Sequence, residues 1–329
     1  MQTLTDAGLR IVLIVDKEDC LIGTVTDGDI RRGLLKGGHL EETIAQIMNK
    51  DPVFVPPGLS KSEMHSILLS SGVLALPIVD DHKHILGLEI LSEVHKDEKL
   101  DVPVLIMAGG FGKRLGDLTK NLPKPMLPLG SKPILEHIVD NFIYHGFKKF
   151  FISTHYKAEE IKKFFKDGKD KGVEIEYLDE DTPLGTAGCL YFLKEKVSDI
   201  FIVINGDLFV DFDFNLLIDF HRKNNAVVTM CVRKSNFHVP YGVVEIEKMQ
   251  VKNIIEKPHY SHDVSAGIYC FSSDALKYLT KIQPIDMPDL FQEIIQKNQK
   301  VLAFPLHEYW MDIGNSDNLT KVRQEYSKI

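Results

Sequence analysis

Apolar and polar positions alternate in blocks over residues 102–329. Compact apolar runs such as VPVLIMA, KFFIST and IFIVING predict buried strands. Apolar residues at helical spacing between them predict helices in PILEHIVDNFIYHG, KAEEIKKFFKDG and LYFLKE. This regular exchange of strand and helix patterns predicts an α/β domain with a mostly parallel sheet that helices cover on both faces.

The first hundred residues contain an internal repeat. GLRIVLIVDKEDCLIGTVTDGDI and GVLALPIVDDHKHILGLEILSEV align without a gap, with Asp16 on Asp80 and Gly23 on Gly87. Each copy predicts a strand, a polar turn and a second strand that leads into a helix. A helix with Met64, Ile67 and Leu68 on one face is expected between the copies, and the charged segment SEVHKDEKLDVP is the expected linker.

This repeat resembles a pair of CBS domains, with a first copy at residues 1–46 and a second at residues 47–100. The resemblance implies a small α+β module that either binds an adenosine nucleotide or serves as a platform for homo-oligomers. The family's ribose-binding pattern, Ser or Thr followed three residues later by Asp, is matched by Thr26 and Asp29. The second copy has Ile90 and Glu93 at these positions, so a second nucleotide site is not expected.

Composition excludes several classes of function. The net charge of −8 argues against a nucleic-acid partner, and no apolar run approaches the length of a membrane helix. The first residues lack a basic segment and a long apolar core, so no signal peptide is expected. The four cysteines form no CxxC pair. These features predict a cytoplasmic protein with reduced thiols.

A glycine-rich loop follows the first strand of the predicted α/β domain, in LIMAGGFGKRLGDLTKNLPKP. It lacks the third glycine of a dinucleotide-binding fingerprint, because Leu115 stands there, and it lacks the Ser or Thr of a Walker A loop, because Arg114 follows Lys113. Glycines without a Cβ can nevertheless point backbone N–H groups at phosphate oxygens. Arg114 adds a planar fork and Lys124 a fixed ammonium, so the pattern predicts a phosphate site.

The segment LIMAGGFGKRL…PKPMLPLGSKPILEHIV resembles the signature of sugar-phosphate nucleotidylyltransferases, and further similarity recurs to about residue 325. The resemblance implies a Rossmann-like α/β domain over residues 101–329, which joins a sugar 1-phosphate to a nucleoside triphosphate and releases pyrophosphate. Asp117 stands where the family often has proline, but this position does not bind phosphate.

Two aspartates complete the expected catalytic set. VINGDLFVD and EYWMDIG place Asp207 and Asp312 at strand ends, and two carboxylates beside a triphosphate suit Mg²⁺. The resemblance assigns the metal to these aspartates, and catalysis to Arg114, Lys124, Asp207 and Lys257. It implies nucleotide-binding roles for Ala108, Gly109, Gly110, Gly112, Lys113, Glu180, Gly185 and Thr186, and sugar-binding roles for Gly242, Glu256 and Gly267.

The motifs leave the nucleotide and the sugar substrate open between several families of transferases. The CBS pair together with PYGVV, SAGIY, DMPDL and YWMDIG resembles the guanylyltransferases of bacterial legionaminic acid synthesis, which implies GTP and glucosamine 1-phosphate. Guanylyltransferases acting on mannose or heptose 1-phosphate, and uridylyl- or thymidylyltransferases, share most of these motifs. A non-catalytic protein that senses nucleotides is the alternative from another class.

Overall fold

The computed structural model describes residues 11–35, 43–60, 75–90 and 102–326, together with residues 63, 64, 67, 68, 71 and 73. The chain divides into two compact units, Met1–Glu98 and Lys99–Ile329. The expected linker, residues 92–103, lies outside the described residues except for its last two positions. The predicted boundary near residue 100 therefore stays a prediction.

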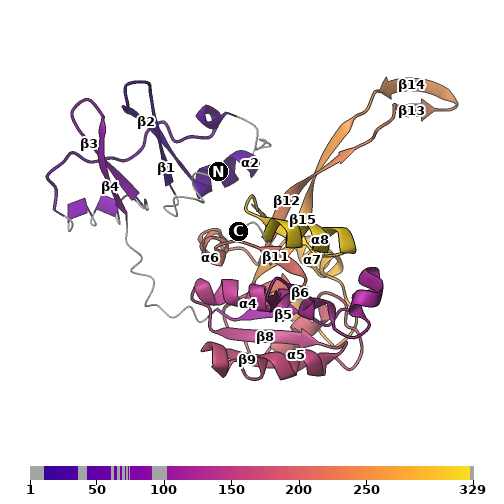
Figure 1. Cartoon of the computed structure of the whole chain (residues 1–329). Helices are drawn as coiled ribbons and strands as arrows, with labels where there is room; N and C mark the ends of the chain where they lie inside the picture. Colours follow the sequence, from indigo (N-terminus) through magenta and orange to yellow (C-terminus); the bar gives the residue numbers. More distant parts are fainter. Residues whose placement is uncertain are drawn as a thin grey trace. The chain divides into compact units, whose positions relative to one another are not determined.

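A seven-stranded sheet with the order β16-β12-β15-β10-β5-β8-β9 forms the centre of the larger unit (Figure 1). Strand β15 runs antiparallel to both of its neighbours, whereas the other four pairings are parallel. The predicted mostly parallel sheet is confirmed. Its strands are β5 (Val104–Met107), β8 (Lys149–Thr154), β9 (Glu174–Asp179), β10 (Ile200–Asn205), β12 (Val228–His238), β15 (His259–Ser272) and β16 (Val301–Pro305).

Helices cover both faces of this sheet because successive residues of the buried strands point to opposite sides. Ile106 faces one hydrophobic core and Leu105 the other. The first core is shared with α4 (Ile134–Tyr144), α5 (Ala158–Phe165), α6 (Phe214–Lys223) and α8 (Ser316–Tyr326). The second is shared with α7 (Met287–Gln296) and the 3₁₀ segments η6 (Gly188–Leu193) and η7 (Ser273–Tyr278). No helix within the described ranges is long and apolar enough to cross a membrane.

Short elements complete the larger unit. They are the 3₁₀ segments η3 (Lys113–Thr119), η4 (Lys124–Met126) and η5 (Lys169–Lys171), and three two-stranded ladders, β6 (Pro128–Leu129) with β7 (Lys132–Pro133), β11 (Leu208–Val210) with β17 (Trp310–Asp312), and β13 (Val243–Glu247) with β14 (Gln250–Ile255).

The helix expected in LYFLKE is instead the 3₁₀ segment η6. Its buried leucines, Leu190 and Leu193, lie three residues apart, and this spacing aligns side chains on a 3₁₀ helix. The segment also begins at Gly188, where a Cβ would lie 2.7 Å from the backbone oxygen of Gln283. The sequence pattern showed the buried face but did not distinguish the two kinds of helix.

Strands β12 and β15 continue as a two-stranded ribbon beyond the point where β16 stops pairing (Figure 1). Strand β16 pairs with β12 only as far as Val232, whereas β12 and β15 remain paired from Val232 and Ser265 to His238 and His259. Figure 1 shows the hairpin of β13 and β14 at the far end of this ribbon, standing clear of the sheet. We call residues 233–264 the arm.

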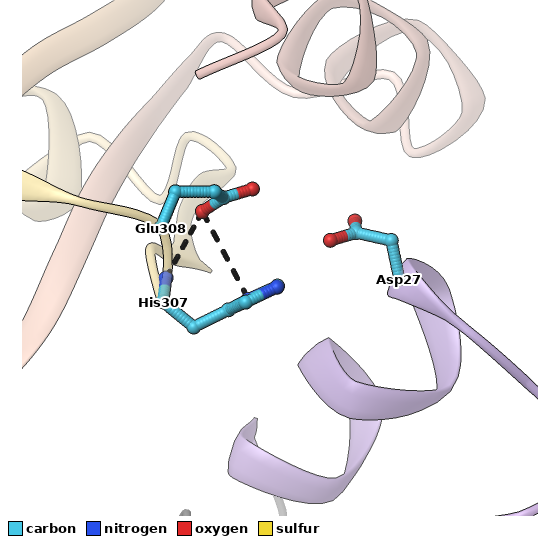
Figure 2. A group of neighbouring side chains, drawn as sticks. All are labelled: Asp27, His307 and Glu308. Carbon is cyan, nitrogen blue, oxygen red and sulfur yellow. Dashed lines mark hydrogen bonds and ion pairs between the residues drawn. The ribbon is translucent and has the colours of Figure 1, made fainter. Parts of the chain in front are cut away.

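The root of the arm is held by the segment that follows β16. The N–H of Leu306 donates to the oxygen of Val232 at 2.8 Å, and Arg233 Nη1 donates to the oxygen of Glu308 at 2.8 Å. Figure 2 shows His307 and Glu308 side by side in this segment, where the N–H of His307 donates to Glu308 Oε2 at 3.0 Å. These contacts fix the direction in which the arm leaves the sheet.

The predicted repeat is confirmed in the smaller unit. Strands β1 (Ile11–Val15) and β2 (Leu21–Thr26) correspond, at an offset of 64 residues, to β3 (Ala75–Val79) and β4 (Ile85–Ile90), and each ladder shows a register shift at the same place. Asp16 Oδ1 accepts from the N–H groups two and four residues later, and so does Asp80 Oδ1. Equal residues therefore make equal turns. The unit also contains α2 (Asp27–Leu35) and η1 (Ile44–Gln46).

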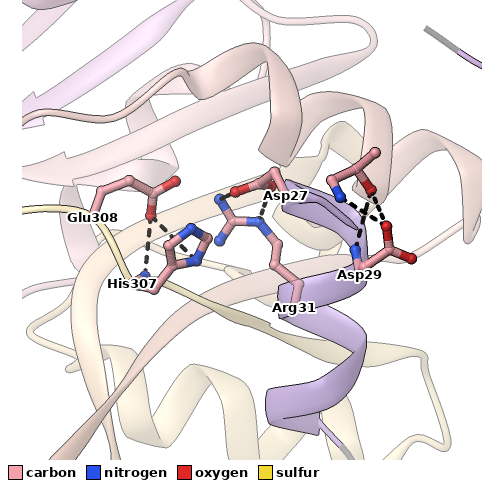
Figure 3. Close-up of polar contacts among 6 residues, drawn as sticks. Asp27, Asp29, Arg31, His307 and Glu308 are labelled. Atoms are coloured by element: carbon pink, nitrogen blue, oxygen red, sulfur yellow. Dashed lines mark hydrogen bonds and ion pairs between the residues drawn. The ribbon is translucent and has the colours of Figure 1, made fainter. Parts of the chain in front are cut away.

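Thr26 and Asp29, the predicted ribose-binding pair, bond to each other at the start of α2. Asp29 Oδ2 accepts from the N–H of Thr26 at 2.8 Å and from its hydroxyl at 2.6 Å, and Thr26 Oγ1 accepts from the N–H of Asp29 at 3.3 Å. Figure 3 shows Asp29 in this position, with Asp27 paired to Arg31 one turn further along. The arrangement is a capping box, which explains the pattern structurally, and a nucleotide-binding role stays a prediction.

One buried polar network ties α6 to the sheet. His221 is 1% exposed, with Nδ1 2.9 Å from Thr229 Oγ1 and Nε2 3.1 Å from Ser272 Oγ. Because the Ser272 hydroxyl donates to the oxygen of Ala226 at 2.8 Å, it accepts from Nε2–H, and Nδ1 accepts from Thr229. Burial lowers the pKa of His221 to about 4, so the fold holds the neutral ring.

We expect this histidine to make stability fall with acidification. The unfolded chain takes up a proton near pH 6.5, whereas the folded protein does so only near its pKa of about 4, so the stabilisation is complete above pH 6.5 and is lost below it. Between pH 7 and pH 5 the loss is about 2 kcal/mol. Urea unfolding of the wild type and of His221→Gln at both pH values measures it, and equal pH dependence in the two proteins would contradict the prediction.

Candidate active site

The carboxyl ends of β5 and β10 lie side by side at one edge of the sheet, where ligands bind in open α/β sheets. The N–H of Gly206 donates to the oxygen of Met107 at 2.9 Å, and a Cβ on Gly206 would lie 2.7 Å from that oxygen. Only glycine permits this approach, which sets Asp207 beside the glycine-rich loop. The sequence analysis did not select Gly206. Its position between a buried strand and an aspartate could have indicated a close approach of two backbones.

Asp312 reaches the same edge through the small ladder of β11 and β17. Leu208 pairs directly with Asp312, and the N–H of Ile313 donates to the oxygen of Asp207 at 3.0 Å. Two aspartates that are distant in the sequence are therefore neighbours in the fold, as their predicted shared role requires.

Lys124 lies between these two carboxylates. Its ammonium donates to Asp207 Oδ2 and lies 3.9 Å from Asp312 Oδ1, and the residue is only 6% exposed. The preceding Pro123 and following Pro125 restrict the backbone in η4, so the side chain enters the site from a defined position. A buried cation of this kind is retained only where carboxylates offset its desolvation.

Arg114 reaches the same group from the glycine-rich loop. Its Nη1 lies 3.5 Å from the place that a Cβ on Gly314 would take, and that place is 3.2 Å from Asp312 Oδ1. Burial raises the pKa of Asp312, and Asp207 raises it further, whereas Lys124 and Arg114 act in the opposite direction. The four residues predicted at phosphates and metal thus form one electrostatic group.

The residues at this edge fit a divalent cation. Asp312 Oδ1 is buried and accepts no hydrogen bond from any residue that the structure describes. A buried carboxylate oxygen without a donor, beside a second carboxylate, is the type of oxygen ligand that Mg²⁺ takes, and the ion keeps several waters. Asp207 and Asp312 would be its protein ligands.

The glycine-rich loop folds tightly onto this group. Gly112 has a φ of +64°, and a Cβ there would lie 2.9 Å from the side chain of Thr119 and 3.0 Å from that of Lys124. The hydroxyl of Thr119 lies 3.2 Å from the oxygen of Gly112, to which it donates. Gly110 is exposed and has open space around it, so its backbone is accessible to a ligand. The side chain of Lys113 lies outside the described part of the structure.

Glu180 lies behind the loop and is used within the protein. Its Oε1 accepts from the hydroxyl of Ser153, its Oε2 accepts from the N–H of Leu184 at 2.9 Å, and a Cβ on Gly109 would lie 3.3 Å from Oε1. The neighbouring Ala108 donates its N–H to the oxygen of Ser153 at 3.0 Å. Glu180 therefore joins the loop to β8, and a role in base binding stays a prediction.

Gly185 and Thr186 form a junction with the start of α7. Gly185 has a φ of +72°, and a Cβ there would lie 2.6 Å from the oxygen of Ile285. The N–H of Thr186 donates to Asp286 Oδ1 at 2.9 Å, and Thr186 Oγ1 accepts from the N–H of Met287 at 2.7 Å. These contacts are structural, and the predicted contact with a nucleobase is not tested by them.

The predicted sugar-binding residues are divided between two places. Gly267, with a φ of +70°, lies against Asn205, whose Nδ2 would be 2.5 Å from a Cβ at that position. Gly242 and Glu256 are on the arm and its hairpin, where a Cβ on Gly242 would lie 3.1 Å from Glu256 Oε2. The predicted catalytic residue Lys257 follows Glu256, and its Nζ lies 4.0 Å from Glu256 Oε1.

Lys257 is therefore not part of the group at the sheet edge. Its side chain is 61% exposed, and within the described residues the ion pair it forms is with Glu256, not with Asp207 or Asp312. The continuous pairing of β12 with β15 is the physical cause, because it carries Lys257 outward on the arm. That Lys124 and Lys257 face the same sugar phosphate therefore stays a prediction.

Comparison with known proteins agrees with the two-unit organisation. The family model described as Nucleotidyl transferase matches residues 103–329, and the family model described as CBS domain matches residues 44–88. The first match covers more than half of the chain. The second falls on the second predicted copy of the repeat, so a CBS assignment for the first copy stays a prediction.

Similar curated proteins include the mannose-1-phosphate guanylyltransferase catalytic subunit beta of Drosophila pseudoobscura pseudoobscura, 36% identical over 217 residues, which are 64% of this chain and 58% of that protein. The protein of the same name from Drosophila melanogaster is 36% identical over 218 residues, with the same two shares. The chain spans about three fifths of the length of these relatives, 58% in both cases.

Among solved structures, HddC from Yersinia pseudotuberculosis is similar, with a TM-score of 0.55 and 24% identity, over 68% of this chain and 99% of that chain. At this level of identity the similarity shows a shared fold.

The contact between Gly267 and Asn205 yields a test of what this glycine does. We expect Gly267→Ala to destabilise the protein by about 3 kcal/mol, because the methyl group adds a collision with Asn205 to the strain of a positive φ. The control is Gly146→Ala, where φ is +92° but the surrounding space is open, so only backbone strain of about 1–2 kcal/mol remains. Urea unfolding measures both, and equal losses would contradict a packing role for Gly267.

Proposed function

The chain belongs to the nucleotidyl transferase family, and we propose that it transfers a guanylyl group from GTP to a sugar 1-phosphate and releases pyrophosphate. The observation that supports this most directly is the group formed by Arg114, Lys124, Asp207 and Asp312 at the carboxyl edge of the sheet. Both substrates are anions, so the first task of the site is to bring negative charges together.

Each residue of the group has a role in this reaction. Backbone N–H groups of the glycine-rich loop and the fork of Arg114 hold the phosphates that leave as pyrophosphate. The ammonium of Lys124, which lies against Asp207 and near Asp312, neutralises charge on the reacting phosphates. A Mg²⁺ ion on Asp207 and Asp312 would supply further neutralisation of the triphosphate. The phosphate oxygen of the sugar substrate is already ionised at neutral pH, so no general base is needed.

The curated relatives favour a particular substrate pair. Their names point to GTP and mannose 1-phosphate, and we therefore place mannose 1-phosphate ahead of the glucosamine 1-phosphate that the resemblance to legionaminic acid enzymes implied. These two sugars differ at carbon 2, where mannose has a hydroxyl group and glucosamine an amine that is cationic at neutral pH. The two groups also point in different directions, axial in mannose and equatorial in glucosamine, so discrimination depends on how the site contacts carbon 2.

A pyrophosphate-release assay tests the proposal. The four nucleoside triphosphates are each combined with mannose, glucosamine, glucose and heptose 1-phosphates in the presence of Mg²⁺. The expected result is the highest kcat/KM for GTP with mannose 1-phosphate. Highest activity with glucosamine 1-phosphate would restore the earlier substrate, and absence of pyrophosphate from every pair would refute the proposed activity.

Substitution of the buried lysine tests the mechanism. We expect Lys124→Ala to lower kcat by roughly 10²- to 10³-fold, as loss of one preorganised charged donor does. Lys120→Ala is the matched control, because Lys120 is in the same segment but its side chain is 72% exposed and pairs with Asp117. It should keep near wild-type turnover.

The comparison is made on folded protein, since removing Lys124 also leaves two carboxylates without their cation. Circular dichroism and thermal unfolding with and without Mg²⁺ establish that both variants are folded. Near-normal turnover of a folded Lys124→Ala protein would exclude the proposed role of Lys124. An equal loss of kcat in Lys120→Ala would mean that the loss reflects the change in net charge and not the position of Lys124.

A further inference from the structure

Three aromatic rings meet at the glycine-rich loop. The ring of Phe111, which belongs to the loop, has its centroid 5.4 Å from that of His155 and 5.5 Å from that of Tyr156. The contact between Phe111 and His155 is edge-to-face, a geometry that aromatic pairs prefer. His155 and Tyr156 directly follow β8, in the turn that leads to α5. We call these three residues the aromatic clasp.

The sheet itself brings the clasp to the loop. Strands β5 and β8 run parallel, with Met107 opposite Ser153, so the chain leaves both strands at the same edge. One strand then leads into the glycine-rich loop and the other into His155 and Tyr156. The Nδ1–H of His155 donates to the oxygen of Glu180 at 2.7 Å, and this bond holds the ring at the end of β9. The clasp is therefore supported by regular strands.

Tyr156 binds the loop at both of its ends. Its N–H donates to the oxygen of Gly109 in a long hydrogen bond of 3.5 Å, and its hydroxyl donates to the oxygen of Thr119 at 3.2 Å. Thr119 in turn closes the loop from within, because its hydroxyl lies 3.2 Å from the oxygen of Gly112 and 3.1 Å from that of Gly116. One residue outside the loop thus connects its beginning to its end.

The loop needs such contacts to keep one shape. Residues 108–112 are irregular backbone between β5 and η3, and three of these five residues are glycine. Glycine loses more conformational freedom on ordering than any other residue. A loop that is ordered before its ligand arrives loses less freedom on binding, so it binds more tightly. The contacts of the clasp therefore affect how well the loop N–H groups hold a phosphate.

The reacting charges are held separately from the clasp. Lys124 is held by Asp207, to which its ammonium donates, and by Asp312 at 3.9 Å. Loosening the loop should therefore weaken binding of the triphosphate and leave these charges in place. This difference separates a positioning role of the clasp from a direct role in the reaction.

We propose that Tyr156 is a positioning residue for the triphosphate, because it ties both ends of the glycine-rich loop together. With Phe111 and His155 it holds the loop N–H groups in the arrangement that binds phosphate. The identity of the ligand rests on the proposed function, whereas the effect on the loop does not. An aromatic cluster that only adds to the stability of the fold is the alternative outcome of the tests.

Hydrogen exchange tests the effect on the loop without any activity. The Tyr156→Phe variant keeps the ring and loses only the hydroxyl bond to Thr119. We expect amide exchange in residues 108–119 to become about 3- to 10-fold faster, because one hydrogen bond no longer closes the loop. Exchange in the central strand β10 should be unchanged, which shows that the variant is folded. Unchanged exchange in the loop would overturn the proposal.

Tyr177→Phe is the matched control. The hydroxyl of Tyr177 also donates to a backbone oxygen, that of Lys166 at 2.7 Å, but this tyrosine is in β9. Its substitution should leave exchange in residues 108–119 and the binding of GTP unchanged. Equal effects of the two substitutions would show a general loss of stability and would overturn the specific role of Tyr156.

Kinetics and calorimetry test the role at the triphosphate. Tyr156→Phe should raise KM for GTP about 3- to 10-fold and change kcat by less than about twofold, because Lys124 keeps its partners. The Kd of GTP without sugar substrate should rise by the same factor. The inhibition constant of pyrophosphate should rise likewise, since pyrophosphate would occupy the same loop. A fall in kcat at constant KM, or unchanged KM and Kd, would overturn the positioning role.

Substitution of Phe111 tests the ring contacts. Phe111→Ala removes the contacts with both other rings and should raise the Kd of GTP at least as much as Tyr156→Phe does. Phe111→Tyr keeps the ring and should bind GTP as the wild type does. Equal binding of GTP by Phe111→Ala and the wild type would overturn the clasp as the support of the loop.

The wild type measured in parallel separates the two proposals. If the wild type forms no product from any substrate pair, the proposed function is refuted, and exchange in residues 108–119 still decides whether Tyr156 holds the loop. An active wild type that equals Tyr156→Phe in loop exchange and in KM would overturn the positioning role and leave the proposed function standing.

Discussion

The buried ammonium of Lys124 between Asp207 and Asp312 is the interaction on which the active edge of this molecule depends. Lys124 is costly to bury without carboxylates that offset its desolvation, so its position depends on Asp207 and Asp312. Their backbone supports come from three separate places, the turn after β10, the β11–β17 ladder and the η4 segment. These three segments must be folded correctly for the ammonium of Lys124 to reach both carboxylates. The ion pairs in turn hold the ends of the three segments together. In this arrangement, Oδ1 of Asp312 accepts no hydrogen bond from the described residues. This oxygen could therefore serve as a ligand of a metal ion.

Several glycines at this edge of the sheet are required for packing within the protein, whether or not they also contact a ligand. An added Cβ at Gly267 would collide with the side chain of Asn205, and one at Gly206 would collide with the backbone oxygen of Met107. A missing Cβ permits close approach of any atom, and the nearest candidates are those of the adjacent strands. Gly110 differs, because its surroundings are open. Among Gly109, Gly110 and Gly112, only at Gly110 would an added Cβ meet no atom within 4 Å.

The features that the sequence predicted best are those that follow from a repeated or periodic pattern. The offset of 64 residues between the repeat copies is seen again in the strand bounds and register shifts of the structure, because the matched aspartates Asp16 and Asp80 accept the same backbone hydrogen bonds in both turns. Arg114, Lys124, Asp207 and Asp312 meet in the structure, but only Asp207 comes directly after a strand of the large sheet, whereas Asp312 ends β17 and reaches the same edge through its ladder with β11. Thr26 and Asp29 show the limit of this reading, because a capping box and a ribose-binding pair use the same two residue types at the same spacing. The arm was not foreseen, since alternation identifies a strand but not the point at which its neighbour stops pairing.

Separation of the arm from the sheet edge has an electrostatic consequence. In the free protein the carboxylates of Asp207 and Asp312 are balanced by Lys124 and Arg114, so a further cation held permanently among them would compete with a metal ion for the same oxygens. The phosphates of two substrates add several negative charges at once, and additional cations are then required. A lysine on a ribbon outside the group can meet this demand when the substrates are present without neutralising the metal ligands in their absence. Rigid placement suits the carboxylates proposed to hold the metal, whereas placement on an arm would suit the lysine proposed to meet the sugar phosphate.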